Sequence, residues 1–205
     1  MSRLGNRFEL RVRGPNVTPG YFGNDEANAK AFDADGFFRT GDAGCLLDSD
    51  EPEHGILFEG RVSEDFKLSS GTWVSVGTIK VNVVNALVPL GLHVAVTGHG
   101  RDAIGLLIFV DRRFCNQLVR APIGDSGVVM HDEIRSFVIN KLREYNARVR
   151  GSSSRIDRFI LLADAPSVAQ NEITEKGYLN QSAVLRNRSK MIDEMYDSDE
   201  FATVL

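Results

Sequence analysis

The sequence predicts an α+β fold in two parts, with a boundary near residue 61. Short alternating strands and turns rich in Gly and Pro fill the part before this boundary. Beyond it, longer apolar runs at helical spacing alternate with strands. The chain has 205 residues, 42% of them apolar, and no internal repeat. This length suits one large domain, or a small domain with a piece of another.

The first part, residues 1–61, is expected to be strand-rich. In chain order its elements are a strand over 8–17, a short helix over 25–36, and strands over 37–50 and 54–62. Within the second strand, Phe38–Asp42 is expected to run into a tight turn, with Gly41 as the permissive residue and Asp42 as the side-chain cap. The acidic stretch "DSDEPEHG" between the last two strands is interpreted as a solvated hairpin tip.

The second part, residues 62–205, is expected to be a small α+β domain. Its elements are a buried helix over 76–91, two strands over 93–111, an amphipathic helix over 131–150, a strand over 156–167 and a closing helix over 180–196. The helix over 131–150 begins with Asp132-Glu133 and ends in arginines, which matches the helix dipole. The acidic tail after the closing helix is expected to fray.

Composition excludes several classes of function. The 24 Lys+Arg against 28 Asp+Glu give a net charge of −4, so a nucleic-acid partner is not expected. Cys45 and Cys115 lie outside any metal-type spacing, which favours a reducing compartment and two small apolar side chains. The sequence contains no apolar run that would span a membrane, and "MSRLGNRFEL" lacks a secretion signal, so a cytoplasmic protein is expected.

Several motif-like features carry no predicted chemistry. "GDSGV" at 124–128 is interpreted as a turn, and "GHGRDAIG" at 98–105 lacks the spacing of a phosphate loop. His93 and His99 have no Ser, Cys or metal partner at a readable spacing, so they are interpreted as a strand and a loop histidine. No metal site is predicted within the chain.

Three stretches in order do carry a resemblance to a known family. They are "GPNVTPGYFGN", then "GFFRTGDAG…ILFEGRVSEDFKLSSGTWVSV", and then "NEITEKGYLNQSAVL". Together they resemble the C-terminal part of the adenylate-forming acyl-CoA synthetases, and most closely the feruloyl-CoA synthase type. The resemblance implies a mobile C-terminal lid domain over 62–205. It also implies that residues 1–61 are the end of a large AMP-binding N-terminal domain.

The resemblance implies a nucleotide site in the first part. Asp42 matches the carboxylate that accepts hydrogen bonds from the two ribose hydroxyls of AMP, with Thr40 beside it. Arg61 matches the arginine whose fork of donors contacts the nucleotide. Ser63 matches the hinge of the lid, where the family commonly has Asp or Lys; Glu64 is the alternative hinge residue.

The second part is expected to hold the residues of the two chemical steps. Lys67 matches a lysine near the adenylate in the thioester-forming pose, Gly71 a glycine beside the CoA channel, and Trp73 lies near that channel or in the core. Lys176 matches the lysine that bridges the substrate carboxylate and the α-phosphate during adenylation. The family's Pro-x-Gly before this lysine is absent, and Lys190 is a rival for the role by charge alone.

The function implied is that of an AMP-forming acid–CoA ligase acting on an aromatic, feruloyl-like or other acyl carboxylate. It uses ATP, CoA and Mg²⁺, the metal being held mainly by the N-terminal adenylation domain expected before residue 1. The chain is therefore expected to be inactive alone. Two alternatives stay open: a free-standing module that binds a nucleotide, CoA or a protein, and an adenylation domain that feeds a carrier protein or a reductase.

Overall fold

The chain folds into two compact units, Met1–Asp65 and Phe66–Leu205. The computed structural model describes residues 2–4, 7–119, 123–198 and 202–205. The division between the units falls after Asp65, whereas the sequence analysis put the boundary after residue 61. The assignment of the first unit to a large AMP-binding domain stays a prediction.

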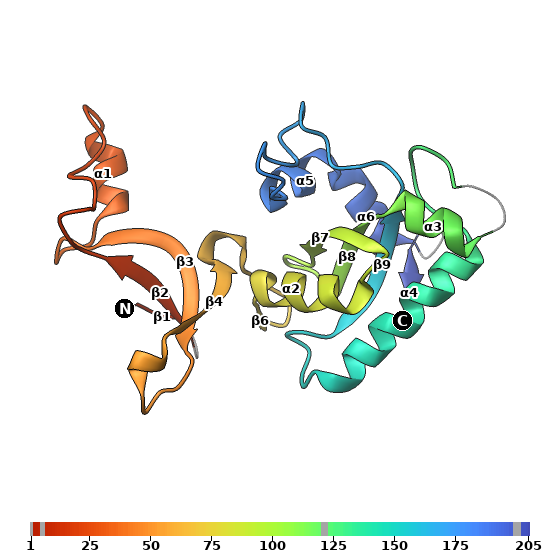
Figure 1. Ribbon diagram of the computed structural model, residues 1–205, viewed down its shortest axis with the longest axis horizontal. Coiled ribbons are helices and arrows are strands. Elements are labelled where there is room, and N and C mark those ends of the chain that lie inside the picture. The colour runs from red at the N-terminus through yellow and green to blue at the C-terminus, as the bar shows by residue number, and fades with distance from the viewer. Residues whose placement is uncertain (1, 5–6, 120–122, 199–201) are drawn as a thin grey trace. The chain divides into compact units, whose positions relative to one another are not determined.

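The first unit is an antiparallel sheet of strands in the order β1-β2-β3-β4 (Figure 1). The strands are β1 (Ser2–Leu4), β2 (Arg7–Val12), β3 (Phe38–Leu46) and β4 (Ile56–Arg61). The helix α1 (Asp25–Ala31) lies between β2 and β3 in the chain, and two short 3₁₀ turns, η1 (Pro52–His54) and η2 (Val62–Glu64), flank β4. The side chain of Asn24 caps α1 by accepting from the N–H of Ala27.

The expected turn at Thr40-Gly41-Asp42 is wrong, because β3 continues through it to Leu46. The register with β4 shifts between Asp42 and Gly44, which makes the site a bulge within a strand. Gly41 has φ +72°, a conformation that favours glycine. The cap is Thr40 and not Asp42: the hydroxyl of Thr40 accepts from the N–H of Asp42 at 3.1 Å.

The second unit is built on a sheet in the order β10-β9-β8-β7. Its strands are β7 (Gly91–Thr97), β8 (Ile104–Val110), β9 (Ile156–Leu162) and β10 (Thr203–Val204). Strands β8 and β9 are parallel, so the chain must cross over between them. The helices α3 (Arg112–Leu118) and α4 (Asp132–Arg148) lie in this crossover. A separate hairpin joins β5 (Phe66–Lys67) to β6 (Trp73–Val74).

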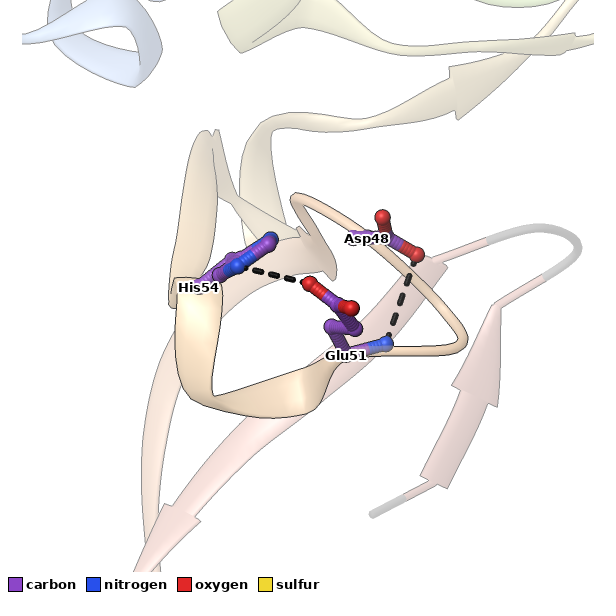
Figure 2. Close-up of side chains that lie close together, drawn as sticks. All are labelled: Asp48, Glu51 and His54. Atoms are coloured by element: carbon purple, nitrogen blue, oxygen red, sulfur yellow. Dashed lines mark hydrogen bonds and ion pairs between the residues drawn. The ribbon is translucent and has the colours of Figure 1, made fainter.

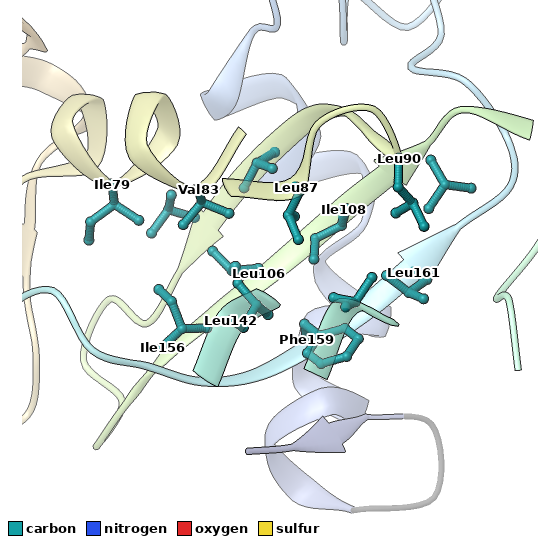
Figure 3. Packing of buried hydrophobic residues seen from close by; sticks show 14 of the residues in the cluster. Ile79, Val83, Leu87, Leu90, Leu106, Ile108, Leu142, Ile156, Phe159 and Leu161 are labelled. Atoms are coloured by element: carbon teal, nitrogen blue, oxygen red, sulfur yellow. The ribbon is translucent and has the colours of Figure 1, made fainter. Parts of the chain in front are cut away.

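Helices cover both faces of this sheet (Figure 1). On one face, α2 (Val76–Leu87) and α4 pack on the sheet, and Figure 3 shows Ile79, Val83 and Leu87 opposite Leu106 and Ile108. On the other face lie α5 (Gln181–Asn187) and α6 (Ser189–Asp197). All seven residues of β8 are buried because both of its faces are covered.

Two expectations for the second unit are wrong, and one helix was missed. The closing helix is two helices, because Arg188 between α5 and α6 has φ −109° and ψ 21°. The helix α3 was not predicted. The tail does not fray at Thr203–Val204, which pair with Phe159 and Arg158 of β9; residues 199–201 of the tail lie outside the described residues. Among the helices that the structure describes, none has the length and apolar character to cross a membrane.

Candidate nucleotide and catalytic site

The bulge of β3 brings together Thr40, Asp42 and Arg61, the three residues predicted to contact the nucleotide. Asp42 and Arg61 are partners in the register of β3 and β4. Arg61 Nη1 donates to Asp42 Oδ1 at 2.8 Å and to the carbonyl of Thr40 at 3.2 Å. The hydroxyl of Thr40 donates to the carbonyl of Leu10 at 2.8 Å, which ties the bulge to β2.

The polar side chains of this cluster are accessible to a ligand. The side chain of Asp42 is 31% exposed and that of Arg61 is 56% exposed. Within the described parts of the chain, Nη1 is the only side-chain nitrogen of Arg61 with a hydrogen-bond partner. An exposed carboxylate with a free oxygen can accept from a diol, and the free guanidinium N–H groups can donate to phosphate oxygens.

The end of the first unit is held by a buried ion pair. Arg7 Nη2 lies 2.7 Å from Asp65 Oδ2, with side chains 10% and 0% exposed. Ser63, the predicted hinge, is exposed in η2 just before this anchored residue. The hinge role of Ser63, or of Glu64, stays a prediction.

The β5–β6 hairpin brings together Lys67, Gly71 and Trp73, all of them exposed. Lys67 Nζ lies 5.7 Å from the centre of the Trp73 ring, a cation–π distance. The hairpin is hydrogen-bonded to the loop after β7: the N–H of Ser69 donates to the carbonyl of Arg101, and the N–H of Gly100 donates to the carbonyl of Lys67. Sequence reasoning missed this support, although both segments carry the glycine signal of a tight turn.

Lys176 is exposed at the tip of a hairpin formed by residues 172–180, called here the Lys176 hairpin. Ile173 and Leu179 form its bridge, and Gly177 has φ +79°. The N–H of Thr174 donates to the carbonyl of Tyr178, and the N–H of Gly177 donates back to Thr174. The absent Pro-x-Gly is thus replaced by a different ordered turn. Lys190 lies in α6, where it pairs with Glu194 at 3.9 Å.

A buried ionic cluster that sequence reasoning missed lies at the base of this hairpin. Its members are Asp164, Glu172 and Arg188. The side chain of Glu172 is 0% exposed and that of Arg188 is 13% exposed. No spacing in the sequence signals this cluster, because its members come from three separate segments.

The acidic loop at the tip of β3 and β4 is shown in Figure 2, with Asp48, Glu51 and His54 close together. His54 Nε2 lies 2.8 Å from Glu51 Oε2, and the N–H of Glu51 donates to Asp48 at 3.4 Å. Glu51 and His54 are exposed. Glu51 and His54 thus pair through their side chains, while the Asp48 carboxylate accepts from backbone N–H groups of the same loop, as in a solvated hairpin tip.

The remaining candidates have ordinary surroundings. His93 lies in β7, where burial lowers its pKa, and His99 stacks on Phe66 in the loop after β7. Burial raises the pKa of the Cys115 thiol in α3 to about 11, so this thiol is unreactive at neutral pH.

Comparison with known proteins gives the family. Residues 82–200, more than half of the chain, match the family described as AMP-binding enzyme C-terminal domain. The chain therefore belongs to this family, and it carries the C-terminal domain of the adenylate-forming acyl-CoA ligases.

Two curated relatives set the level of similarity. The probable chloroplastic acyl-activating enzyme 16 of Arabidopsis thaliana is 24% identical over 204 residues, which are 93% of this chain and 26% of that protein. The 2-succinylbenzoate–CoA ligase of Listeria innocua is 44% identical over 69 residues, 34% of this chain and 14% of that protein. The chain thus spans about a quarter or less of the length of these relatives.

A solved structure confirms the α+β fold. The A domain of the carboxylic acid reductase of Segniliparus rugosus, in complex with AMP and a co-purified carboxylic acid, has a TM-score of 0.73 at 20% identity. The match covers 93% of this chain and 28% of that one. At this identity the match bears on the fold alone.

Proposed function

We propose that the chain supplies the nucleotide-binding strands and the C-terminal domain of an AMP-forming acid–thiol ligase. The observation that carries this proposal is the cluster of Thr40, Asp42 and Arg61 on the bulge of β3. Within the described part of the chain, the cluster offers a carboxylate oxygen and guanidinium donors that have no hydrogen-bond partner, side by side. That combination suits the ribose diol and the phosphate of AMP.

In the first chemical step, ATP and a carboxylate would form an acyl-adenylate and pyrophosphate. Asp42 would accept from the two ribose hydroxyls, and Arg61 would donate to ribose and phosphate oxygens. Lys176 would bring an ammonium to the α-phosphate and the substrate carboxylate, offsetting negative charge as the new bond forms. Its exposure at a hairpin tip suits a group that must reach a ligand.

In the second step, a thiol would displace AMP from the acyl-adenylate. Lys67 would lie beside the nucleotide, while Gly71 and Trp73 would border the channel of the CoA arm. Gly71 has φ +80° and a Cβ there would meet no other atom within 4 Å, so its surroundings leave open space for a ligand. Ser63 would be the hinge between the two poses.

The acid is proposed to be a hydroxycinnamate of the ferulate type. The support is the stretch "EDFKLSSGTWVSVG", which resembles the feruloyl branch of the family. Mg²⁺ would be held outside the described clusters, with the triphosphate of ATP.

The direct test of the nucleotide site is AMP binding to the 205-residue chain, measured by isothermal titration calorimetry. Asp42→Asn is expected to weaken binding, and Asp35→Asn, an exposed carboxylate of the same unit, is expected to leave it unchanged. Equal binding by both variants would contradict the proposed site. In a second assay, the isolated chain is expected to release no pyrophosphate from ATP and ferulate, whereas the complete ligase is expected to turn over.

A reductase-linked adenylation domain is the second candidate. It is favoured by sequence similarity to the carboxylic acid reductase of Mycobacterium marinum, which is 26% identical over 191 residues, 93% of this chain and 15% of that protein. The two candidates differ in the acceptor of the acyl group. Formation of a ferulate–CoA thioester by the complete protein would support the ligase, and transfer to a carrier protein without CoA would support the reductase type.

A further inference from the structure

Glu172 is one of the residues that anchor the base of the Lys176 hairpin. The N–H of Glu172 donates to the carbonyl of Ser167 at 2.9 Å, and the carbonyl of Glu172 accepts from the N–H of Asn180 at 2.8 Å. The backbone of Glu172 thus joins the start of the hairpin to Asn180 at its other end and to Ser167 in the preceding loop. Whatever fixes the side chain of Glu172 therefore fixes the base from which Lys176 extends.

Arg188 fixes that side chain in a bidentate pair. Arg188 Nε donates to Glu172 Oε1 at 3.0 Å, and Nη2 donates to Oε2 at 2.9 Å. Oε2 also accepts from the N–H of Ser167 at 2.9 Å. Two parallel bonds set the orientation of the carboxylate as well as its distance.

The arginine is in turn held from two further sides. Arg188 Nη1 lies 2.6 Å from Asp164 Oδ2, and its guanidinium carbon lies 5.1 Å from the centre of the Phe109 ring in β8. The pair is therefore bound to β8, one of the two inner strands of the sheet. Arg188 also occupies the break between α5 and α6, where its backbone leaves helical geometry.

The charges in this cluster are stable at neutral pH. Burial alone would raise the pKa of Glu172, but the hydrogen bonds from Arg188 and from the N–H of Ser167 outweigh it and lower the pKa. Burial opposes the charge of Arg188 as well, and its bonds to Glu172 and Asp164 raise its pKa overall.

We propose that Glu172 and Arg188 are positioning residues for adenylation, which hold the Lys176 hairpin at a fixed place on the sheet. The inference rests on the proposed role of Lys176. A buried ion pair adds little net stability compared with an apolar pair of similar volume, because both ions lose their hydration. Its distinguishing property is fixed geometry, which an extended lysine at a hairpin tip requires.

The test uses Glu172→Gln and Arg188→Lys in the complete ligase, since both keep the volume but lose the bidentate ion pair. The matched control is Arg186→Gln, which removes an exposed arginine from α5. The kcat of adenylate formation is expected to fall about 10- to 100-fold in both test variants, with little change in KM for ATP. Thioester formation from preformed acyl-adenylate is expected to stay within about twofold of the parent protein.

A second measurement separates positioning from stability. In the 205-residue chain, amide order parameters of residues 174–178 by NMR are expected to fall in Glu172→Gln while those of β8 stay unchanged. A loss of order throughout the second unit, or an equal loss of both half-reactions, would assign the pair a structural role and overturn the inference.

Lys176→Ala separates the failure of this inference from that of the proposed function. If that variant loses adenylation while Glu172→Gln and Arg188→Lys behave like Arg186→Gln, the positioning role alone is overturned. If Lys176→Ala keeps full adenylation, the assigned role of Lys176 fails, and the positioning role fails with it.

Discussion

Two arginine–carboxylate pairs in this protein have the same chemistry and opposite surroundings. Arg61 and Asp42 meet at a single 2.8 Å contact on the edge of a bulge, with side chains 56% and 31% exposed. Arg188 and Glu172 meet in a bidentate pair with side chains 13% and 0% exposed. Among the residues that the structure describes, the first pair leaves guanidinium donors and one carboxylate oxygen without a hydrogen-bond partner, and the second pair uses both carboxylate oxygens internally.

The difference in exposure decides which role each pair can have. An exposed pair adds about 0–1 kcal/mol to the free energy of unfolding, so it can be rearranged around a ligand at little cost. Removal of one partner from a buried pair leaves an unpaired charge and costs about 3–5 kcal/mol. Burial thus separates a pair suited to binding from a pair suited to holding a backbone in place.

The largest expected effect is on catalysis, at the exposed tip that the buried pair supports. Lys176→Ala in the complete ligase should slow adenylate formation by about 10²- to 10³-fold, because the variant loses the charge that the proposed role places opposite the developing phosphorane. Thioester formation from preformed acyl-adenylate should be unchanged. The two half-reactions are measured separately by pyrophosphate release and by CoA consumption. A loss confined to the second half-reaction would reassign this lysine.

The next largest effect is on stability, and it follows from a substitution that removes one partner of the buried pair. Arg188→Ala should lower the free energy of unfolding of the second unit by about 3–5 kcal/mol, since Glu172 would be left charged and buried. Urea denaturation followed by circular dichroism measures this change. Arg186→Ala should shift it by less than about 0.5 kcal/mol. Similar values for the two arginines would mean that the buried carboxylate finds other partners.

Removal of a charge from the exposed pair should change ligand affinity and leave the free energy of unfolding nearly unchanged. Asp42→Asn should reduce the affinity for AMP about 10- to 100-fold, the equivalent of a lost charge-assisted hydrogen bond. The free energy of unfolding should change by no more than about 1 kcal/mol. Calorimetric titration and urea denaturation of the same variant give both numbers. A destabilised variant with intact AMP affinity would make Asp42 a structural residue.

The smallest expected effect is the pH dependence of the stability that the buried pair contributes. The pKa of Glu172 is lowered in the folded state from its ordinary value of 4.5. Its charge therefore contributes stability above about pH 4.5, and this contribution is lost as the pH falls through the folded-state pKa. The difference in free energy of unfolding between the parent chain and Glu172→Gln should shrink below pH 4.5. A constant difference down to pH 3 would contradict the lowered pKa.

The sequence was informative wherever the signal is local. The pattern of apolar residues predicted β2, β3 and β4 in the first unit and β7, β8 and β9 in the second, and helical spacing predicted α2 and α4. The Asp-Glu start and arginine end of α4 follow from the helix dipole, and the structure has them in its first and last turns. The ordered motifs gave the family, which the match over residues 82–200 confirms.

The sequence was misleading where a distant contact overrides the local preference. Residues 180–196 have the composition of one helix, yet Arg188 interrupts it where its side chain pairs with Glu172 and Asp164. The Thr-Gly-Asp stretch has the composition of a turn, yet pairing with β4 on one side and β2 on the other keeps it in the sheet. In each case partners remote in sequence set the backbone.

The sequence by itself determined most of the strands and the helices α2 and α4, which residues are apolar enough to be buried, and which family the chain resembles. Only the tertiary structure decided that Asp42 and Arg61 would meet across two strands in the open, while Glu172 and Arg188 would meet in the interior. The physical reason is that burial depends on what covers a residue, and the covering elements come from elsewhere in the chain. The sequence shows that a residue is a glutamate, but it does not show whether water surrounds the carboxylate.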